Sequence, residues 1–200
     1  MDIEKTLKSL RAKGYEASYF ETGAEAADYV AGEIHGETVG IGGSKTVEAL
    51  GLFERLQKDG NTVYWHWKQE PAEEARRNAN AANVYMCSAN GLSETGEIVN
   101  IDGGGNRLAA SCYDKRRVFF LVGQNKVEES FEKALWRARN VASPLNARRL
   151  NMDTPCVKGE LRCYDCESPA RICRALEVFW CKPLGIDRFD VVLIGEDFGY

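Results

Sequence analysis

The run of apolar residues from Val118 to Val122 places the strongest constraint on how this chain can fold. Five apolar side chains follow one another there, between Arg117 and Gly123. A strand with one face in water alternates apolar and polar residues, whereas this run is apolar on both faces. Such runs are typical of central strands in parallel sheets covered on both sides. The sequence therefore predicts a buried parallel strand at residues 117–123.

Shorter apolar runs alternate with helical patterns along the rest of the chain. Further strands are expected at residues 38–41, 61–67, 83–87 and 190–195. Helices are expected at Thr46–Leu56, Pro71–Ala82, Glu128–Asn140 and Ser143–Leu150, the second of them polar and solvated. This alternation predicts an α/β fold with a mostly parallel open sheet flanked by helices. We expect one domain over residues 1–200, with a Cys-rich excursion at residues 151–189 within it.

A further helix, near the start of the chain, has a clear start signal. Thr22 is followed three residues later by Glu25, which is the spacing of a capping box. In that motif each side chain accepts a hydrogen bond from the backbone N–H of the other residue. We therefore predict a helix over Ala24–Val30 with Thr22 as its N-cap.

The composition fits a globular chain and restricts the classes of partner. The net charge is −4, which argues against a nucleic-acid partner. No apolar run reaches the ~18 residues of a membrane span. The segment Met1–Lys5 is polar and charged, so we expect no secretory signal and a cytoplasmic location. The 7 cysteines are then expected as thiols or metal ligands rather than as disulfides.

A Gly-rich turn, Gly42-Gly43-Ser44, directly follows the strand predicted at residues 38–41. A strand, a Gly-rich turn and a helix start can aim free backbone N–H groups at an anion. The spacing differs from a nucleotide P-loop and from a dinucleotide fingerprint, so neither ligand is indicated. Two interpretations stay open: an anion-binding turn, or a tight turn with Ser44 as the helix N-cap.

Residues Ser88–Arg107 form the most polar and Gly-rich stretch of the chain. Glycine lets a backbone approach a ligand closely, and Asn, Asp and Glu supply directed hydrogen bonds. Ligands of open α/β sheets bind beyond the carboxyl ends of strands, so the turns at Gly42, Asn90 and Asn125 are expected to meet at one edge. We interpret Ser88–Arg107 as one wall of a binding site and the Gly42 turn as the second wall.

Four cysteines of the tail are spaced C-x6-C-x2-C-x6-C. Four thiolates in one loop-rich segment can surround a single metal ion or cluster. Zinc ribbons usually bring two C-x2-C pairs and this segment has one, which favours a 4Fe–4S iron–sulfur cluster slightly over zinc. Free thiols or a disulfide stay open as alternatives, with Cys181 as a reserve ligand. The predicted metal ligands are Cys156, Cys163, Cys166 and Cys173.

Six segments carry a more specific pattern: Ile41–Thr46, Leu50–Leu52, Asn90–Asp102, Gly105–Arg107, Val122–Lys126 and Ser143–Leu150. Together they resemble the lactate-utilisation (LUD) domain family and its LutC-like members, over nearly the whole chain. The resemblance implies a fold like that of the ribose phosphate isomerase, glucosamine phosphate deaminase (NagB/RpiA) and CoA-transferase superfamily. It also implies a role as a subunit or accessory in the oxidation of L-lactate to pyruvate, within a complex containing iron–sulfur subunits.

The chain departs from the sugar-phosphate isomerases of that superfamily at one strand end. They carry Gly-Ala-Asp where this chain has Ser88-Ala89-Asn90, and Asn90 cannot take a proton as their aspartate does. Glu94 or Asp102 would have to supply the catalytic carboxylate instead. A stand-alone isomerase or acyl-transfer enzyme acting on a sugar phosphate or CoA ester is therefore the first alternative function. The second is a non-enzymatic metal-binding or electron-transfer module.

The lactate-related hypothesis expects a small anionic organic acid or phosphate as ligand and iron–sulfur redox subunits as partners, with self-association left open. Arg107 or Lys126 would pair with the ligand's carboxylate or phosphate, and plain surface charge is the alternative for both. The predicted catalytic residues are Glu94 and Asp102. The predicted ligand-binding residues are Gly42, Gly43, Ser44, Thr46, Asn90, Asn100, Asn106, Arg107 and Lys126.

Overall fold

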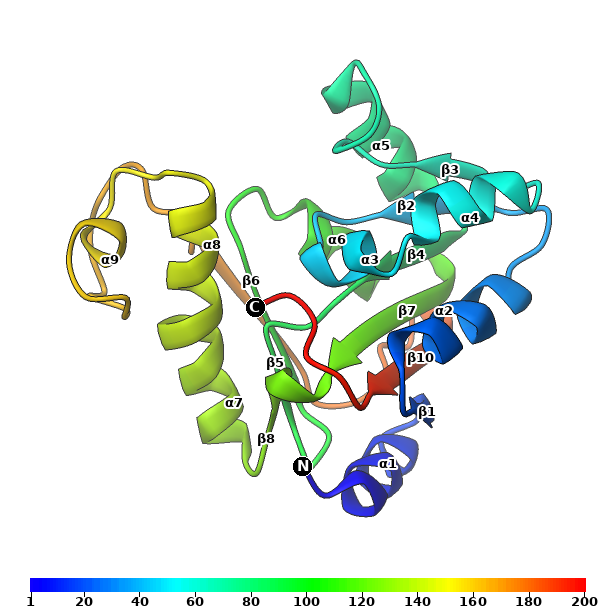
Figure 1. The fold of residues 1–200 in the computed structure, drawn as a ribbon, viewed down its shortest axis with the longest axis horizontal. Coiled ribbons are helices and arrows are strands. Elements are labelled where there is room, and N and C mark those ends of the chain that lie inside the picture. Colours follow the sequence, from blue (N-terminus) through cyan, green and yellow to red (C-terminus); the bar gives the residue numbers. More distant parts are fainter.

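The larger of two β-sheets forms the centre of the molecule in the computed structural model, which describes residues 1–200 (Figure 1). Its six strands are all parallel and lie in the order β1-β10-β7-β4-β2-β3. This confirms the predicted α/β fold with a parallel sheet. The strands are β1 (Glu16–Phe20), β2 (Thr38–Ile41), β3 (Thr62–Tyr64), β4 (Val84–Cys87), β7 (Lys115–Gly123) and β10 (Ile186–Ile194).

Both faces of β7 are buried, as its apolar run predicts. Phe119 and Leu121 pack into the core on one face of the sheet. Val118, Phe120 and Val122 pack into a second core on the other face. All five side chains are fully inaccessible to solvent, because layers of the protein cover the sheet on both sides.

Three helices cover the first face: α2 (Gly23–Gly32), α3 (Lys45–Ala49) and α4 (Leu52–Lys58). The predicted capping box of α2 is present, with Thr22 and Glu25 each bonding the backbone N–H of the other. The helix predicted at Thr46–Leu56 is wrong as a single element. Gly51 adopts a left-handed conformation (φ 63°) and separates α3 from α4.

One further prediction needs correction. The strand predicted at residues 61–67 stops at Tyr64, because Trp65 N donates to Gln69 Oε1 (2.8 Å) in a turn. The helix α5 (Ala72–Ala81) has the predicted solvated face, with Glu73, Glu74 and Arg77 exposed, while Ala75 and Ala79 are buried on its other side. It packs so closely on β2 that a Cβ at Gly40 would lie 2.1 Å from Ala79 O.

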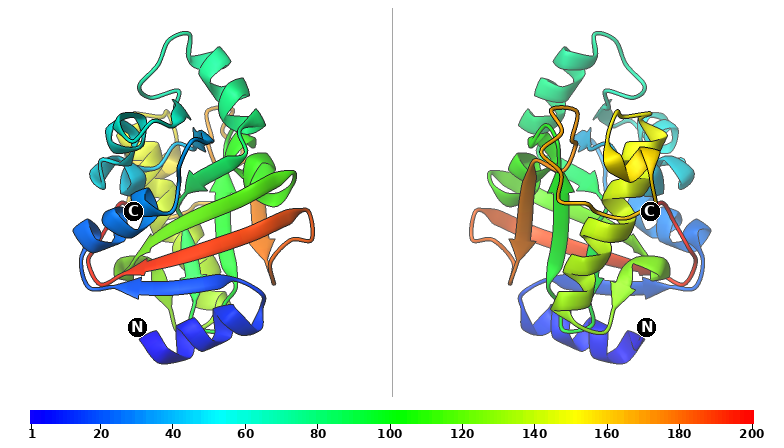
Figure 2. Two further views of the ribbon diagram at one scale, coloured as in Figure 1. Left: turned by 90° about the vertical axis from the view of Figure 1, so that its right-hand side faces the viewer. Right: turned by 90° about the vertical axis from the view of Figure 1, so that its left-hand side faces the viewer.

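A second sheet, which the sequence analysis did not predict, covers the other face together with α1 (Ile3–Ala12) and α6 (Asn106–Cys112). Its strands run across those of the parallel sheet (Figure 2). It contains a hairpin of β5 (Gly91–Ser93) and β6 (Ile98–Asp102), flanked by β8 (Val127–Glu128) and β9 (Ala175–Phe179). The polar stretch after β4 is thus partly sheet, and β9 lies within the segment expected to be a Cys-rich excursion.

The helices α7 (Phe131–Arg137) and α8 (Ser143–Arg149) are joined by a π-helical turn at Ala138–Ala142 into one rod. The rod and the Cys-rich segment with the short helix α9 (Pro155–Lys158) form a smaller lobe beside the main body (Figure 1). Lys126 lies in the short 3-10 turn Gln124–Lys126 that follows β7. None of the helices combines the length and the apolar character needed to cross a membrane.

We predict that Glu97→Gln destabilises the fold by about 1–2 kcal/mol at neutral pH. Glu97 lies in the β5–β6 turn and is tied to α1, because Lys13 Nζ donates to its Oε1 (2.7 Å). Burial alone would raise its pKa, but the hydrogen bonds from Lys13, Ser93 and Thr95 outweigh burial and lower the pKa to about 2. A lowered pKa contributes stability above the unfolded value of about 4.3, and that contribution is lost as the pH falls toward about 2.

The measurement is urea unfolding of wild type and Glu97→Gln at a series of pH values, with the exposed Glu16→Gln as control. The stability difference should be largest near neutral pH and vanish at the acid end. A difference that stays constant across the series would refute the role given to the Glu97 carboxylate.

Candidate functional site

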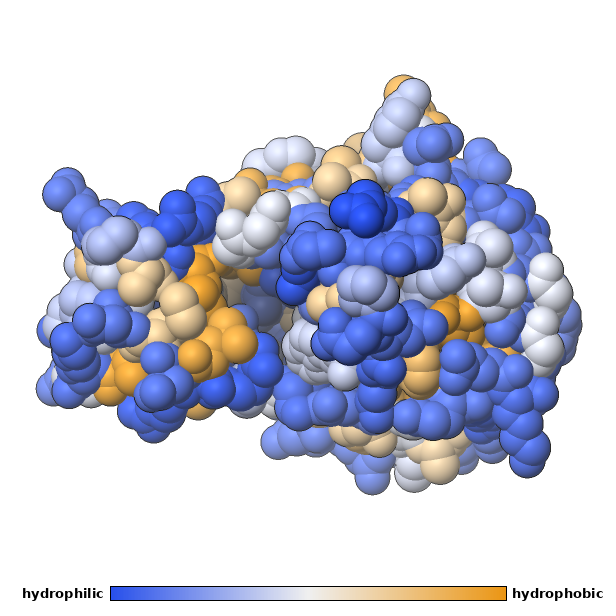
Figure 3. Space-filling model, turned by 90° about the horizontal axis from the view of Figure 1, so that it is seen from above, coloured by the Kyte–Doolittle hydropathy of each residue, from blue (hydrophilic) through white to orange (hydrophobic).

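A cavity of about 600 Å³ lies beyond the carboxyl ends of β2, β4 and β7. Figure 3 shows it as a hollow between the main body and the smaller lobe. Gly43–Lys45 follow β2, Ser88–Asn90 follow β4, and Lys126 follows β7. The chain runs from β2 outward to β3 and then back to β4, so the cavity lies at the switch in strand order. This is the place where open α/β sheets bind ligands, and the three turns meet there as expected.

The two glycines of the β2–α3 turn are required by close packing. A Cβ on Gly42 would lie 2.6 Å from Tyr85 Oη, and a Cβ on Gly43 would lie 3.2 Å from Trp67 Cζ2. Gly43 lines the cavity, whereas Gly42 lies behind its surface. The glycines therefore let the turn fit between two aromatic side chains beside the cavity.

Ser44 has the N-cap role that the sequence left open. Its Oγ accepts a hydrogen bond from Val47 N (3.3 Å) at the start of α3, and the residue also lines the cavity. Thr46 is fully buried and does not line the cavity itself. Its hydroxyl instead accepts a hydrogen bond from Lys126 Nζ (2.9 Å).

Asn90 and Asn100 form a structural pair that fixes the turn after β4. Asn90 N donates to Asn100 Oδ1 (3.1 Å), and Ile101 N donates to Asn90 Oδ1 (2.8 Å). The buried Arg137 guanidinium adds bonds to Asn90 O (2.6 Å) and Asn125 O (2.8 Å), which join the turns after β4 and β7. Asn90 lines the cavity, but Asn100 is fully buried behind it.

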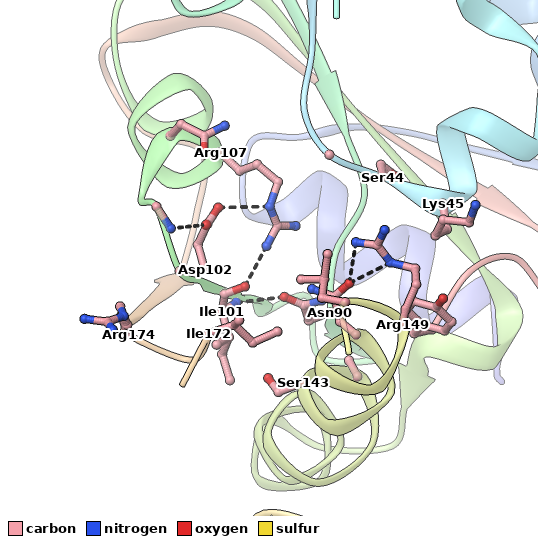
Figure 4. Close-up of a pocket in the computed structure, with 18 of the residues that line it drawn as sticks. Ser44, Lys45, Asn90, Ile101, Asp102, Arg107, Ser143, Arg149, Ile172 and Arg174 are labelled. Carbon is pink, nitrogen blue, oxygen red and sulfur yellow. Dashed lines mark hydrogen bonds and ion pairs between the residues drawn. The ribbon is translucent and has the colours of Figure 1, made fainter. Parts of the chain in front are cut away.

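Asp102 is the one acidic side chain among the lining residues, and it orients Arg107 (Figure 4). Its Oδ2 accepts from Arg107 Nε (2.9 Å), and its Oδ1 accepts from the backbone N–H groups of Gly104 (3.0 Å) and Gly105 (3.3 Å). Arg107 Nη2 also donates to Ile101 O (2.6 Å). The Asp102 carboxylate is therefore already occupied by internal donors.

The other predicted carboxylate lies elsewhere. Glu94 is in the β5–β6 turn, where its carboxylate accepts from Asp2 N (2.7 Å) and Lys5 Nζ (3.1 Å). These bonds attach the start of α1 to the second sheet, and Glu94 does not line the cavity. Asn106, by contrast, does line it.

Cationic side chains dominate the cavity wall although the whole chain carries a net charge of −4. Against the single carboxylate of Asp102 stand seven Lys and Arg side chains, which come from both the main body and the smaller lobe. They are Lys45, Arg76, Arg107, Lys126, Arg149, Arg171 and Arg174.

Four of these cations have no carboxylate partner. Arg149 donates to Asn146 Oδ1 through Nε (3.0 Å) and Nη2 (2.8 Å), and its guanidinium lies over the Trp67 ring (5.0 Å). Arg171 and Arg174 donate to backbone carbonyls. Lys126 bonds only to hydroxyls. No carboxylate balances the charges of the three arginines, so the cavity is suited to an anion.

Lys126 is the most deeply buried of these cations, at 3% exposed. Its Nζ lies 2.9 Å from Thr46 Oγ1 and 2.9 Å from Ser88 Oγ. Burial lowers the pKa of the amine to about 7, and the nearby positive charges of Arg137 and Arg107 add to this effect. Both effects favour the neutral amine over the ammonium.

Sequence reasoning missed most of the cationic wall. Lys45 is adjacent to the Gly42 turn, and Arg149 belongs to the motif Ser143–Leu150, so local signals existed for both. Arg171 and Arg174 lie in the Cys-rich segment. They reach the cavity only because that segment folds back against α8, which no local pattern indicates.

The four tail cysteines line one small hollow that adjoins the cavity, and Ser143, Arg171 and Ile172 line both. Cys163 Sγ accepts hydrogen bonds from Asp165 N (3.4 Å) and Arg139 Nη2 (3.7 Å). All 7 cysteines are free thiols in this structure. No group of three or more His, Cys, Asp or Glu side chains converges at metal-binding distance. The hollow is lined by Cys156, Cys163, Cys166 and Cys173.

Comparison with known proteins gives a family and a fold. The family model described as LUD domain matches residues 3–194. A crystal structure of a DUF162 family protein from Deinococcus radiodurans has a similar fold, with a TM-score of 0.57 at 11% sequence identity. The similarity covers 96% of this chain and 94% of that one. A comparison with curated proteins found no match.

We predict that the stability of wild type relative to Lys126→Met rises by about 1.4 kcal/mol per pH unit above pH 7. The folded protein releases the Lys126 proton at about pH 7, whereas the unfolded chain holds it up to about pH 10.4. Between these values the unfolded state binds one more proton, so raising the pH favours the folded state. Chemical unfolding at pH 7 and pH 9 measures the effect.

The matched control is Lys133→Met on α7, where the lysine is exposed and pairs with Glu129. Its stability relative to wild type should not change between the two pH values. If the stability of Lys126→Met relative to wild type is equally independent of pH, the Lys126 amine is charged in the folded protein, and its lowered pKa is refuted.

Proposed function

The chain belongs to the LUD domain family, which is associated with lactate utilisation, and from this membership we propose that it is a subunit or accessory of L-lactate oxidation to pyruvate. Its part is to bind a small organic anion in the cavity beyond β2, β4 and β7. Removal of electrons from lactate requires an acceptor, and we assign that role to iron–sulfur partner subunits.

One observation carries the binding proposal: the cavity wall holds seven basic side chains and one acidic side chain. A carboxylate ligand gains charge-assisted hydrogen bonds from guanidinium groups that have no carboxylate of their own. Arg149 and Arg174 offer such groups from opposite sides of the opening, as Figure 4 shows. Ser44 and Asn106 supply uncharged hydrogen-bonding groups for the rest of the ligand.

An isomerase that uses Glu94 or Asp102 as acid or base has less support. Glu94 lies outside the cavity and bonds to Asp2 and Lys5. Asp102 lines the cavity, but its two oxygens already accept three hydrogen bonds from Arg107 and the backbone. A role in positioning Arg107 fits its contacts better than proton transfer to a ligand.

We predict that Arg149→Met weakens binding of L-lactate or pyruvate roughly tenfold or more, which corresponds to about 1.5–3 kcal/mol for a charge-assisted hydrogen bond. The neighbouring Arg148→Met is the matched control, because Arg148 is exposed and lies outside the cavity. Isothermal titration calorimetry of wild type and both variants measures the affinities. Equal affinities for the two variants, or a wild-type protein that binds neither acid, would contradict the proposal.

We further propose that the four tail cysteines bind a metal centre, an iron–sulfur cluster or zinc. Two observations support this. All four line a single hollow, and Cys163 Sγ accepts N–H hydrogen bonds that would stabilise a thiolate. The segment from Gly159 to Arg174 has no helix or strand and no buried side chain. Binding would require the sulfurs to draw together across the hollow, which a segment without a packed core allows.

We predict that protein purified without oxygen contains either iron with acid-labile sulfide or one equivalent of zinc, and that the double substitution Cys163→Ser and Cys166→Ser removes it. Elemental analysis and the visible spectrum distinguish the two metals, since a zinc protein is colourless. Cys112→Ser, which lies outside the hollow, should keep the metal. Neither metal in wild type, with four freely alkylated thiols, would rule the proposal out.

A further inference from the structure

Ser88 and Lys126 lie side by side on the cavity wall in an arrangement that anion binding does not require. Their Oγ and Nζ atoms are 2.9 Å apart, and both residues line the cavity. Ser88 is 5% exposed and Lys126 is 3% exposed, so the lysine is held away from bulk water. A hydroxyl within hydrogen-bond reach of a buried amine is the geometry of a nucleophile and its base.

The surrounding hydrogen bonds determine which of the two side chains donates the hydrogen bond between them. Thr46 Oγ1 donates to Phe198 O (3.2 Å), so it accepts its bond from Lys126 Nζ. The other acceptor near Ser88 Oγ is Ala89 O at 3.5 Å, which is a weak contact. When the amine is neutral, the Ser88 hydroxyl is therefore best satisfied by donating its proton to Lys126 Nζ.

The surroundings of Lys126 favour its neutral amine overall, although Cys87 on β4 acts in the opposite direction. Burial lowers the pKa of Lys126 to about 7, and the positive charges of Arg137 from α7 and Arg107 from α6 add to this effect. Cys87 from β4 is kept a neutral thiol, because burial raises its pKa. The C-terminal segment contributes the backbone of Gly199, where a Cβ would lie 3.2 Å from Lys126 Nζ.

From this geometry we propose that Ser88 and Lys126 form a catalytic nucleophile–base pair that hydrolyses an ester or thioester of a small anionic acid. This activity goes beyond the binding role proposed above and rests on it only for the negative charge of the acyl compound. The serine follows β4 directly, at the carboxyl edge of the sheet, so its position is set by the rigid parallel strands.

The reaction balances with water as the second substrate. Ser88 Oγ transfers its proton to Lys126 Nζ and forms a bond to the acyl carbon, while the bond to the leaving oxygen or sulfur breaks. Lys126 then returns the proton to the leaving alcohol or thiol. In the second half, water attacks the acyl-serine, Lys126 takes the proton of the water, and that proton passes to Ser88 Oγ as the free acid leaves.

The test uses two activated esters with the full-length chain: the anionic mono-p-nitrophenyl ester of succinic acid and the neutral p-nitrophenyl acetate. We expect a burst of p-nitrophenolate and a matching acyl mass on the peptide that contains Ser88. Ser88→Ala should leave that peptide unlabelled, and Lys126→Met should slow acylation about 100-fold or more. Ser18→Ala on β1, outside the cavity, should acylate like wild type.

The pH profile of wild type supplies a second measurement that depends on no variant. Acylation should increase with pH through about 7 and then level off, because the base must be neutral. A rate that rises without levelling off, an acyl group on other residues only, or a folded Lys126→Met protein that acylates like wild type would overturn the pair.

The two proposals can fail separately. Equal acylation of Ser88 by the anionic and the neutral ester supports the nucleophile–base pair and counts against the anion preference of the cavity. Binding of L-lactate without acylation by either ester overturns the pair and leaves the binding proposal intact.

Discussion

Burial of the parallel sheet on both faces determines where chemistry can occur in this protein. Helices α2, α3 and α4 cover one face, and the second sheet with α1 and α6 covers the other. Apart from the buried ion pair of Arg117 and Asp190, the sheet interior is mostly apolar, and polar and charged groups gather where the strands end. At the carboxyl edge the turns after β2, β4 and β7 meet, and the buried Arg137 guanidinium holds two of them together. The cavity lies at this edge because both faces of the sheet are covered.

The charge of the cavity is opposite to the charge of the chain. A net charge of −4 is spread over the surface, while seven basic side chains gather around one carboxylate in the cavity. Such local concentration attracts anions even to a protein that is acidic overall. It also bears on the state of Lys126, because burial and the neighbouring positive charges both disfavour the charged ammonium form of its amine. The same cluster of basic side chains thus underlies both proposals, the binding of an anion and the nucleophile–base pair of Ser88 and Lys126.

Sequence patterns predicted the parts of the fold that local chemistry determines. The apolar run of β7 and the capping box at Thr22 and Glu25 are short-range signals, and both predictions are confirmed. The second sheet was missed because its strands are short and β9 joins β6 from 73 residues away at the pair Ala175 and Asp102. Part of the cationic wall was missed for the same reason. Arg171 and Arg174 reach the cavity through tertiary folding alone.

The central claim is that the cavity holds a small organic anion on arginine side chains. A crystal structure of the protein with saturating L-lactate tests this most directly. The account predicts ligand density between α8 and the turns after β2 and β4, with the carboxylate on at least one of Arg149, Arg171 and Arg174. A cavity filled only by ordered water at saturating lactate, or lactate bound elsewhere on the chain, would contradict it.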